Sequence, residues 1–286
     1  MFRFGKKSYF RICQYIFLLL FALINAQCST NNLSSLDSRA TTVMLLMQSI
    51  TPPKVTNVVV PIDTADTVVY APNHNGIGFL NKSNAVNGIK GTGNYSGSGD
   101  VYSLSQSGVG AIIVLEWSGR RITNGTGIDF IVFENPFYLN STTTQGFIEP
   151  VIVEVSQDNV KYCGFSPTYT YSSSTTFSDV LSYWKGFAGI TPVRYNIESN
   201  PLVGSDLYDT TKTGGDGFDL ENLVADVNPT DLTVACTSTE VSLIKSTGFV
   251  YLRLVSATAR NFPANPNSSG GGPDIDGVIA RYQAPR

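Results

Sequence analysis

The chain has 286 residues, of which 42% are hydrophobic and only 14% charged, with 26 Gly, 14 Tyr and 16 Phe. Aromatic residues favour strands and glycine favours turns, and this amount of apolar side chain excludes an intrinsically disordered protein. The formal net charge of −3 offers no basic surface for nucleic acid, and a single apolar run excludes a polytopic membrane protein.

Residues 1–27 have the pattern of an export signal. A basic head containing Arg3, Lys6, Lys7 and Arg11 precedes an apolar run over 16–24. Nine apolar residues span roughly 14 Å as a helix, about half the hydrocarbon thickness, so the run predicts a signal peptide and not a membrane anchor. Its removal takes four basic and no acidic side chains, which leaves a mature chain with a net charge of −7.

Cys28 stands where a bacterial lipoprotein signal places its acylated cysteine. The stretch resembles the looser lipobox of spirochaetes, although Gln27 occupies a position at which a small residue is usual. The alternative is an ordinary cleaved signal in which Cys28 has no role. We expect a lipid anchor at Cys28, followed by a polar tether with one short helix over residues 28–54.

Residues 55–286 read as strands and turns, and predict an all-β domain. Residues 111–117 form a nearly continuous apolar run, as in a strand buried on both faces, and strands are also expected over 128–134, over 148–156 and around 250–254. Asn124-Gly125 and Asp158-Asn159 indicate tight reversals between strands. A two-sheet sandwich, of the jelly-roll type, buries strands this short and this numerous.

The acidic residues at turns suggest a calcium site. Ca²⁺ binds six to eight oxygens from carboxylates, amides and backbone carbonyls on bendable turns. Three such turns supply the candidate ligands Glu134, Asn135, Asp216, Asp219, Asp274 and Asp276. Each has a structural alternative: Asp219 as the N-cap of a short helix, Asp274 as part of an Asx-turn. In an extended segment, Asp274 and Asp276 face the same side.

The sequence offers fewer candidate residues for other kinds of chemistry. The sequence has no nucleophile elbow, phosphate loop or zinc motif, and its one histidine, His74, lies in a Gly/Asn-rich loop. Glu134, Glu149 and Glu154 on neighbouring strands allow a glycosidase-type pair. Trp184 is the candidate for stacking on a sugar. Cys163 and Cys236, the remaining cysteines of the body, form a disulfide if the compartment is oxidising.

Several motifs, in their serial order, resemble a bacterial cell-surface domain found in PEP-CTERM-sorted proteins and in leptospiral lipoproteins. The stretches that carry the resemblance are 84–88, 97–104, 129–137, 149–158, 184–189, 217–220 and 274–278. The resemblance implies a secreted or surface-anchored β-sandwich of unassigned activity. Pro273 replaces the usual Phe before Asp274, and no C-terminal sorting helix follows, so Cys28 is expected to provide the anchor.

Together these features predict a lipid-anchored binding module of a bacterial outer membrane or cell surface, with one structural Ca²⁺ and a glycan or a host or matrix protein as its partner. Two alternatives remain open. One is a carbohydrate-active hydrolase that uses two of Glu134, Glu149 and Glu154, and the other is a structural envelope protein without a ligand.

Overall fold

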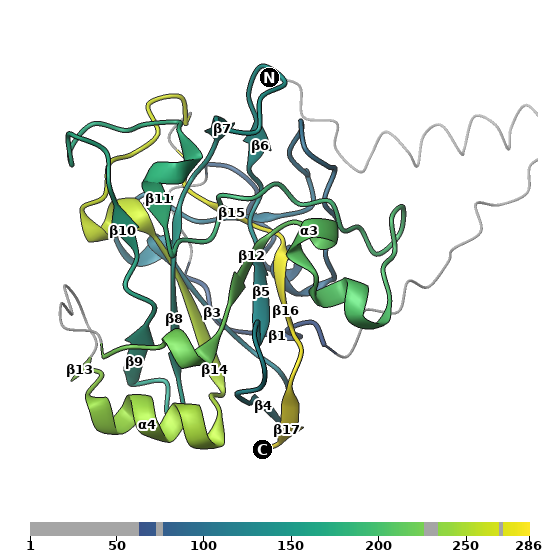
Figure 1. Ribbon diagram of the computed structural model, residues 1–286, viewed down its shortest axis with the longest axis vertical. Helices are drawn as coiled ribbons and strands as arrows, with labels where there is room; N and C mark the ends of the chain where they lie inside the picture. Colours follow the sequence, from purple (N-terminus) through teal and green to yellow (C-terminus); the bar gives the residue numbers. More distant parts are fainter. Residues whose placement is uncertain (1–62, 73–76, 226–233, 269–270) are drawn as a thin grey trace, which may run out of the picture. The chain divides into compact units, whose positions relative to one another are not determined.

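The computed structural model describes residues 63–72, 77–225, 234–268 and 271–286 (Figure 1). The predicted signal peptide, Cys28, the tether and His74 lie outside these residues. A search of the described residues finds no helix with the length and apolar character needed to cross a membrane.

The larger sheet has six strands in the order β1-β3-β14-β8-β9-β13. The strands are β1 (Thr67–Tyr70), β3 (Ile112–Glu116), β14 (Tyr251–Ser256), β8 (Val151–Ser156), β9 (Lys161–Gly164) and β13 (Val234–Ala235). All neighbours pair antiparallel except β13, which runs parallel to β9. The central strand β3 is buried along Ile112–Leu115, which confirms the strand predicted to be covered on both faces.

A second sheet packs against the first. It consists of β12 (Asp216–Phe218), β5 (Phe130–Phe133) and β16 (Gly277–Ala280), which lie side by side in Figure 1. The largest core joins Leu115, Val153 and Leu254 of the six-stranded sheet to Phe130 and Val278 of the three-stranded sheet. Strands of antiparallel sheets are the main regular structure of the described chain and helices are few and short, so the all-β, sandwich-like prediction is confirmed. The jelly-roll type stays a prediction.

Loops and short elements cover the outer face of each sheet. On the six-stranded sheet, Ile112, Ile152 and Val255 pack against Trp184 and Phe187. On the three-stranded sheet, a separate cluster packs three inner residues against four from covering loops: Ile131, Phe133 and Ile279 against Ile89, Val193, Tyr195 and Leu207. Because both faces of each sheet are shielded from water, the inner strands have apolar residues at successive positions and not only at alternate ones.

Four two-stranded ribbons and several short helices complete the described chain. The ribbons pair β2 (Tyr102–Ser103) with β15 (Asp274–Ile275), β4 (Arg120–Ile122) with β17 (Gln283–Pro285), β6 (Phe137–Tyr138) with β7 (Gly146–Phe147), and β10 (Thr168–Tyr169) with β11 (Trp184–Lys185). The helices are α3 (Thr210–Thr213), α4 (Ser238–Thr247) and the 3₁₀ turns η1 (Lys82–Val86), η2 (Val109–Ala111), η3 (Leu181–Tyr183), η4 (Gly204–Tyr208), η5 (Leu220–Asn222) and η6 (Ala257–Arg260). Helix α4 was not predicted, although Thr237 and Glu240 form a capping box at its start.

One of the two predicted reversals is confirmed and the other is wrong. Asp158 accepts the backbone N–H groups of Val160 and Lys161, both at 2.9 Å, and Asn159 adopts a φ of 61° in the hairpin between β8 and β9. Asn124-Gly125 does not join paired strands, because β4 pairs with β17 while β5 pairs with β12 and β16. The bend of this segment lies at residues 126–127, and the local turn signal carried no information on strand partners.

The strand alternation predicted for β8 is confirmed, and it places one acid in a buried ion cluster. Val151, Val153 and Val155 face the central core, whereas Glu154 faces the opposite side. Glu154 accepts hydrogen bonds from Arg253 Nε at 2.5 Å and from Arg260 Nη2 at 3.2 Å, and all three side chains are nearly inaccessible to solvent. The charges compensate one another inside the protein, which assigns Glu154 a structural role.

Cys163 and Cys236 form a disulfide, as the sequence analysis allowed, with a Cα–Cα distance of 5.0 Å. Both residues belong to the central core. The bridge connects β9 to the segment that precedes α4, across 73 positions of sequence. Structural disulfides of this kind are typical of exported proteins.

We expect the disulfide to contribute about 4 kcal/mol to the free energy of unfolding, the value that chain entropy gives for a loop of this length. Urea unfolding of the oxidised protein and of the Cys163→Ala/Cys236→Ala variant measures the difference. Reductant should lower the unfolding midpoint of the natural protein and leave that of the variant unchanged. Equal midpoints for the natural protein with and without reductant would contradict a bridge that stabilises the fold.

Candidate functional site

Three acidic side chains from distant parts of the sequence meet at one end of β5, and we call them the carboxyl cluster: Glu134, Glu149 and Asp274. Glu134 follows β5 directly, where Pro136 prevents the strand from continuing. It is 2% exposed, and its Oε1 accepts the backbone N–H of Asp274 at 2.8 Å. Its Oε2 is buried without a hydrogen-bond partner among the described residues.

Polar neighbours fix the other members of the carboxyl cluster. The hydroxyl of Ser103 donates to Asp274, and Asn135 hydrogen-bonds to the same carboxylate. Asn135 also accepts the Ser98 backbone N–H and donates to the Ser98 carbonyl at 3.0 Å, which binds the loop before β2 to the end of β5. Glu134, Asn135 and Asp274, three of the predicted ligands, are thus brought together.

Gly189 allows a covering loop to approach the carboxyl cluster closely. Its φ is +81°, a conformation that favours glycine. A Cβ at this position would lie 2.9 Å from the Glu149 carbonyl oxygen and 3.1 Å from Glu134 Oε2. The loop therefore closes over Glu134 because residue 189 has no side chain.

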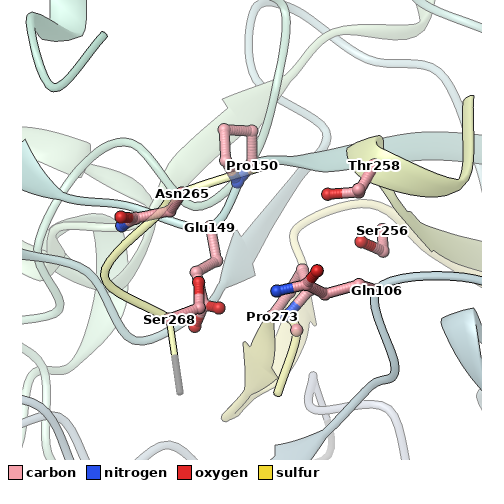
Figure 2. Close-up of a pocket in the computed structure, with 9 residues that line it drawn as sticks. Gln106, Glu149, Pro150, Ser256, Thr258, Asn265, Ser268 and Pro273 are labelled. Carbon is pink, nitrogen blue, oxygen red and sulfur yellow. The ribbon is translucent and has the colours of Figure 1, made fainter. Parts of the chain in front are cut away.

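Glu149 reaches a small pocket of about 10 Å³. Its carboxylate accepts a hydrogen bond from Ser268, and Figure 2 shows these two side chains on one side of the pocket, with Gln106 and Ser256 on the other. Thr258 and Asn265 add further polar groups to the lining. The pocket is small and polar, which suits a water molecule better than an organic ligand.

The carboxyl cluster has too little compensating charge to be fully ionised. No ion pair joins its members to a Lys or Arg within the described part of the chain. Burial, reinforced by the negative charges of Glu149 and Asp274, raises the pKa of Glu134 well above its usual range. Burial also raises the pKa of Asp274, and that of Glu149 to about 7. Near neutral pH the cluster therefore retains protons.

Asp276 lies in a different environment from Asp274, which contradicts the expectation that the two share a face. Asp276 lies between β15 and β16 and is 1% exposed. Both of its oxygens accept the backbone N–H of Lys90 at 3.0 Å, and burial raises its pKa to about 8. The segment is not continuously extended here, because the chain leaves the ribbon with β2 and joins the sheet of β5.

The remaining two predicted ligands, Asp216 and Asp219, line an open groove of about 400 Å³. Its walls contain four aromatic side chains, with Ile190, two glycines and three polar side chains. The lining residues are Phe165, Trp184, Gly186, Phe187, Ile190, Asp216, Gly217, Phe218, Asp219 and Asn222. They come from the start of the loop after β9, from β11 and the covering loop that follows it, and from β12 with η5. We call this feature the aromatic groove.

Asp216 and Asp219 hold the backbone of the aromatic groove in place. Asp216 accepts the N–H groups of Ile190 at 2.9 Å and Thr191 at 3.3 Å, together with the Thr191 hydroxyl at 2.8 Å. Burial raises its pKa to about 6. Asp219 is the N-cap of η5 and accepts the Glu221 N–H at 2.9 Å, so its structural alternative is confirmed.

Trp184 lines the aromatic groove but is only 3% exposed. Its indole N–H donates to the Ser178 carbonyl at 2.8 Å, and its ring packs against Tyr169 with centroids 4.1 Å apart and against Phe187 at 5.4 Å. Such burial leaves no open ring face for the stacking that was expected of this residue. Trp184 instead supports the wall of the groove.

The six predicted calcium ligands do not form one site. The register places Phe218 opposite Phe130, so Asp219 lies at the other end of β5 from Glu134 and Asn135. Among the described residues, no group of three or more His, Cys, Asp or Glu is arranged to hold a metal ion. A calcium site stays a prediction of the sequence analysis, without a ligand set assembled in this structure.

The paired-glutamate hydrolase finds little support in this geometry. Glu154 is held by two arginines, and Glu134 is buried beneath the covering loop. Glu149 alone reaches a pocket, which has little room for a sugar ring. A glycosidase needs both carboxyl groups beside the scissile bond.

Comparisons with known proteins give no independent indication of function: no protein-family model, curated protein or solved structure matches this chain.

Sequence reasoning did not identify several contributors to these sites. Ser103, Ser268 and Gly189 matter through contacts across the fold. Ser103 and Gly189 lie in stretches that carry the family resemblance, but nothing there indicated their contacts with the carboxyl cluster. Phe165 and Asn222 both line the aromatic groove although 57 positions separate them in the sequence. A partial signal existed for the groove, because two quoted motifs, over 184–189 and 217–220, supply most of its lining.

The carboxyl cluster predicts a pH dependence of stability. The folded-state pKa of Glu149, about 7, lies above the unfolded value of about 4.3. The folded protein therefore holds more protons between these values, so this contribution to stability is complete at low pH and is lost as pH rises towards 7. We expect Glu149→Gln to raise the free energy of unfolding at about pH 8 by on the order of 2 kcal/mol.

Thermal melts from about pH 5 to pH 8 provide the measurement. The natural protein should lose stability more steeply than Glu149→Gln across this range. Asp206→Asn, which removes an exposed acid paired with Lys212, is the control and should follow the natural protein. Parallel curves for the natural protein and Glu149→Gln would contradict the proton-retaining cluster.

Proposed function

We propose that this protein is an exported binding module that takes a carbohydrate ligand in the aromatic groove. The observation that carries the proposal is the joining of aromatic walls with carboxylate and amide groups in one open groove of about 400 Å³. Binding sites for small ligands commonly combine a mainly apolar lining with a few polar groups, at volumes of about 300–1,000 Å³.

The polar groups of the aromatic groove suit hydroxylated ligands. Asp219 and Asn222 supply acceptors and a donor, and Asn222 is exposed. The backbone at Gly186 and Gly217 is also exposed, which gives a ligand access to main-chain groups. The apolar face of a sugar ring can pack against Phe165, which is half-buried. The other aromatic side chains of the lining are more deeply buried.

The proposal includes lipid anchoring at the bacterial cell surface through Cys28. It is supported by the basic and apolar pattern of residues 1–27 and by the position of Cys28 after it. The Cys163–Cys236 disulfide fits an oxidising compartment outside the cytoplasm. A host or matrix glycoprotein is a suitable partner for such a module, because its glycan would enter the groove.

A glycan array with neutral, amino and acidic oligosaccharides tests the proposed binding, followed by titration calorimetry with the strongest ligand. Asn222→Ala should weaken binding about fivefold, the equivalent of one lost hydrogen bond. The side chain of Asn222 has no hydrogen bond to the described residues, so the variant should fold normally. Asn200→Ala, which changes an exposed amide outside the groove, should bind like the natural protein. A blank array, or equal affinities for both variants, would overturn the proposal.

The anchor has a separate test. Mass spectrometry of the mature protein from bacterial membranes should find Cys28 as the first residue, carrying acyl chains. The Cys28→Ala variant should leave the membrane fraction, because stable anchoring requires two or more chains. An unmodified cysteine would refute the lipid anchor and leave the carbohydrate site untouched.

A further inference from the structure

The charged side chains that line the aromatic groove are all acidic. Asp216 and Asp219 are the ionisable residues of the lining, which contains no Lys or Arg. Lys185 lies between Trp184 and Gly186 in the sequence and is exposed, but it is not part of the lining. An anionic ligand would therefore meet two carboxylates without a compensating cation.

Acidic residues also surround the end of the groove at Asp219. Burial, opposed by two backbone hydrogen bonds and reinforced by the charges of Asp219 and Glu221, raises the pKa of Asp129 to about 6. Glu221 is exposed, and Lys245 lies 3.9 Å from its carboxylate. Among the charged groups named here, Lys245 is the one cation beside the carboxylates of Asp129, Asp219 and Glu221. The electrostatic potential at Asp219 is therefore negative.

Asp219 has an oxygen available for a ligand, whereas Asp216 does not. Both oxygens of Asp216 accept hydrogen bonds from residues 190 and 191. For Asp219, only Oδ1 accepts a hydrogen bond from the described residues, that of Glu221 N–H. No donor within the described part of the chain takes Oδ2, so this oxygen is available to a donor in the groove.

The aromatic walls offer a ligand one partly exposed ring, that of Phe165. Phe165 and Phe218 meet edge to face, with centroids 5.0 Å apart and planes at 61°. Phe218 directly precedes Asp219. Phe218 is 5% exposed and stacks on Phe130, so the half-buried Phe165 is the ring of this pair that a ligand in the groove can contact.

We propose that the aromatic groove selects an amino sugar, whose protonated amine binds Asp219 Oδ2 while its hydroxyl groups bind Asn222. This inference rests on the proposed carbohydrate-binding function and names the ligand class within it. It excludes sulfated and uronic-acid-rich glycans as ligands, because each added negative charge meets the acidic lining unpaired.

Calorimetric titrations with three matched tetrasaccharides test the selection: glucosamine, N-acetylglucosamine, and a sulfated uronic-acid-containing oligosaccharide. The buffer keeps the glucosamine amines protonated. We expect glucosamine to bind about fivefold more tightly than its N-acetylated counterpart, which has no charge, and the sulfated ligand to bind least. Added salt should reduce the preference for the amine.

Asp219→Asn keeps the side-chain oxygen that caps η5 but removes the charge. It should abolish the preference for glucosamine, so that the charged and the N-acetylated sugar bind this variant with equal affinity. Asp206→Asn is the control and should keep the preference. Equal binding of the charged and acetylated sugars to the natural protein would overturn this inference while leaving carbohydrate binding intact. If none of the three oligosaccharides binds, the proposed function is overturned as well. If a lysine peptide binds as tightly as the glucosamine tetrasaccharide, the assignment of the ligand as a sugar is overturned.

Discussion

Burial of both faces of both sheets is the constraint on which this structure depends. The strands are too apolar to leave one face in water, so loops and short helices must cover the outer faces. Those coverings contain the residues that matter for function. Trp184 and Phe187 bury the outer face of the six-stranded sheet, and the chain around them forms one wall of the aromatic groove. The groove is thus a consequence of how the sandwich closes.

The same packing of loops on the sheets also buries charged side chains away from water. These side chains are found in two different electrostatic environments. Glu154 meets two arginines and stays compensated. Glu134, Glu149 and Asp274 meet polar hydrogen-bond donors but no basic side chain within the described residues, so their pKa values rise. The first arrangement is a fixed structural element, and the second links stability to pH. The aromatic groove is more open, and there Asp219 keeps an oxygen available to a ligand.

The fold was predictable where local pattern decides it. The apolar run of β3 and the alternation in β8 report burial directly, since side chains of a strand alternate between faces. Cys163 and Cys236 were singled out as the candidate disulfide because the predicted body has no other cysteines, but the sequence could not show that they lie close together. Strand partners were not predictable, as the Asn124-Gly125 turn shows, because pairing depends on contacts across the whole chain. Helix α4 was missed although its capping box was visible in the sequence.

The candidate sites were predictable only in part. The acidic turns were correctly singled out as unusual, but the sequence could not tell which of them converge: Glu134, Asn135 and Asp274 do, whereas Asp276 and Asp219 lie elsewhere. Trp184 lines the groove, but the sequence analysis expected its ring to be exposed. The ring is buried because residues 169–187 fold back on themselves and pack against it.

The most direct test of the central claim, that the aromatic groove binds carbohydrate, is NMR titration of the isotopically labelled protein with glucosamine tetrasaccharide. The account predicts that the backbone amide signals of Gly186, Gly217 and Asn222 shift together and saturate, while those near the carboxyl cluster stay in place. Saturating shifts at any other surface, with these three amides unchanged, would contradict it.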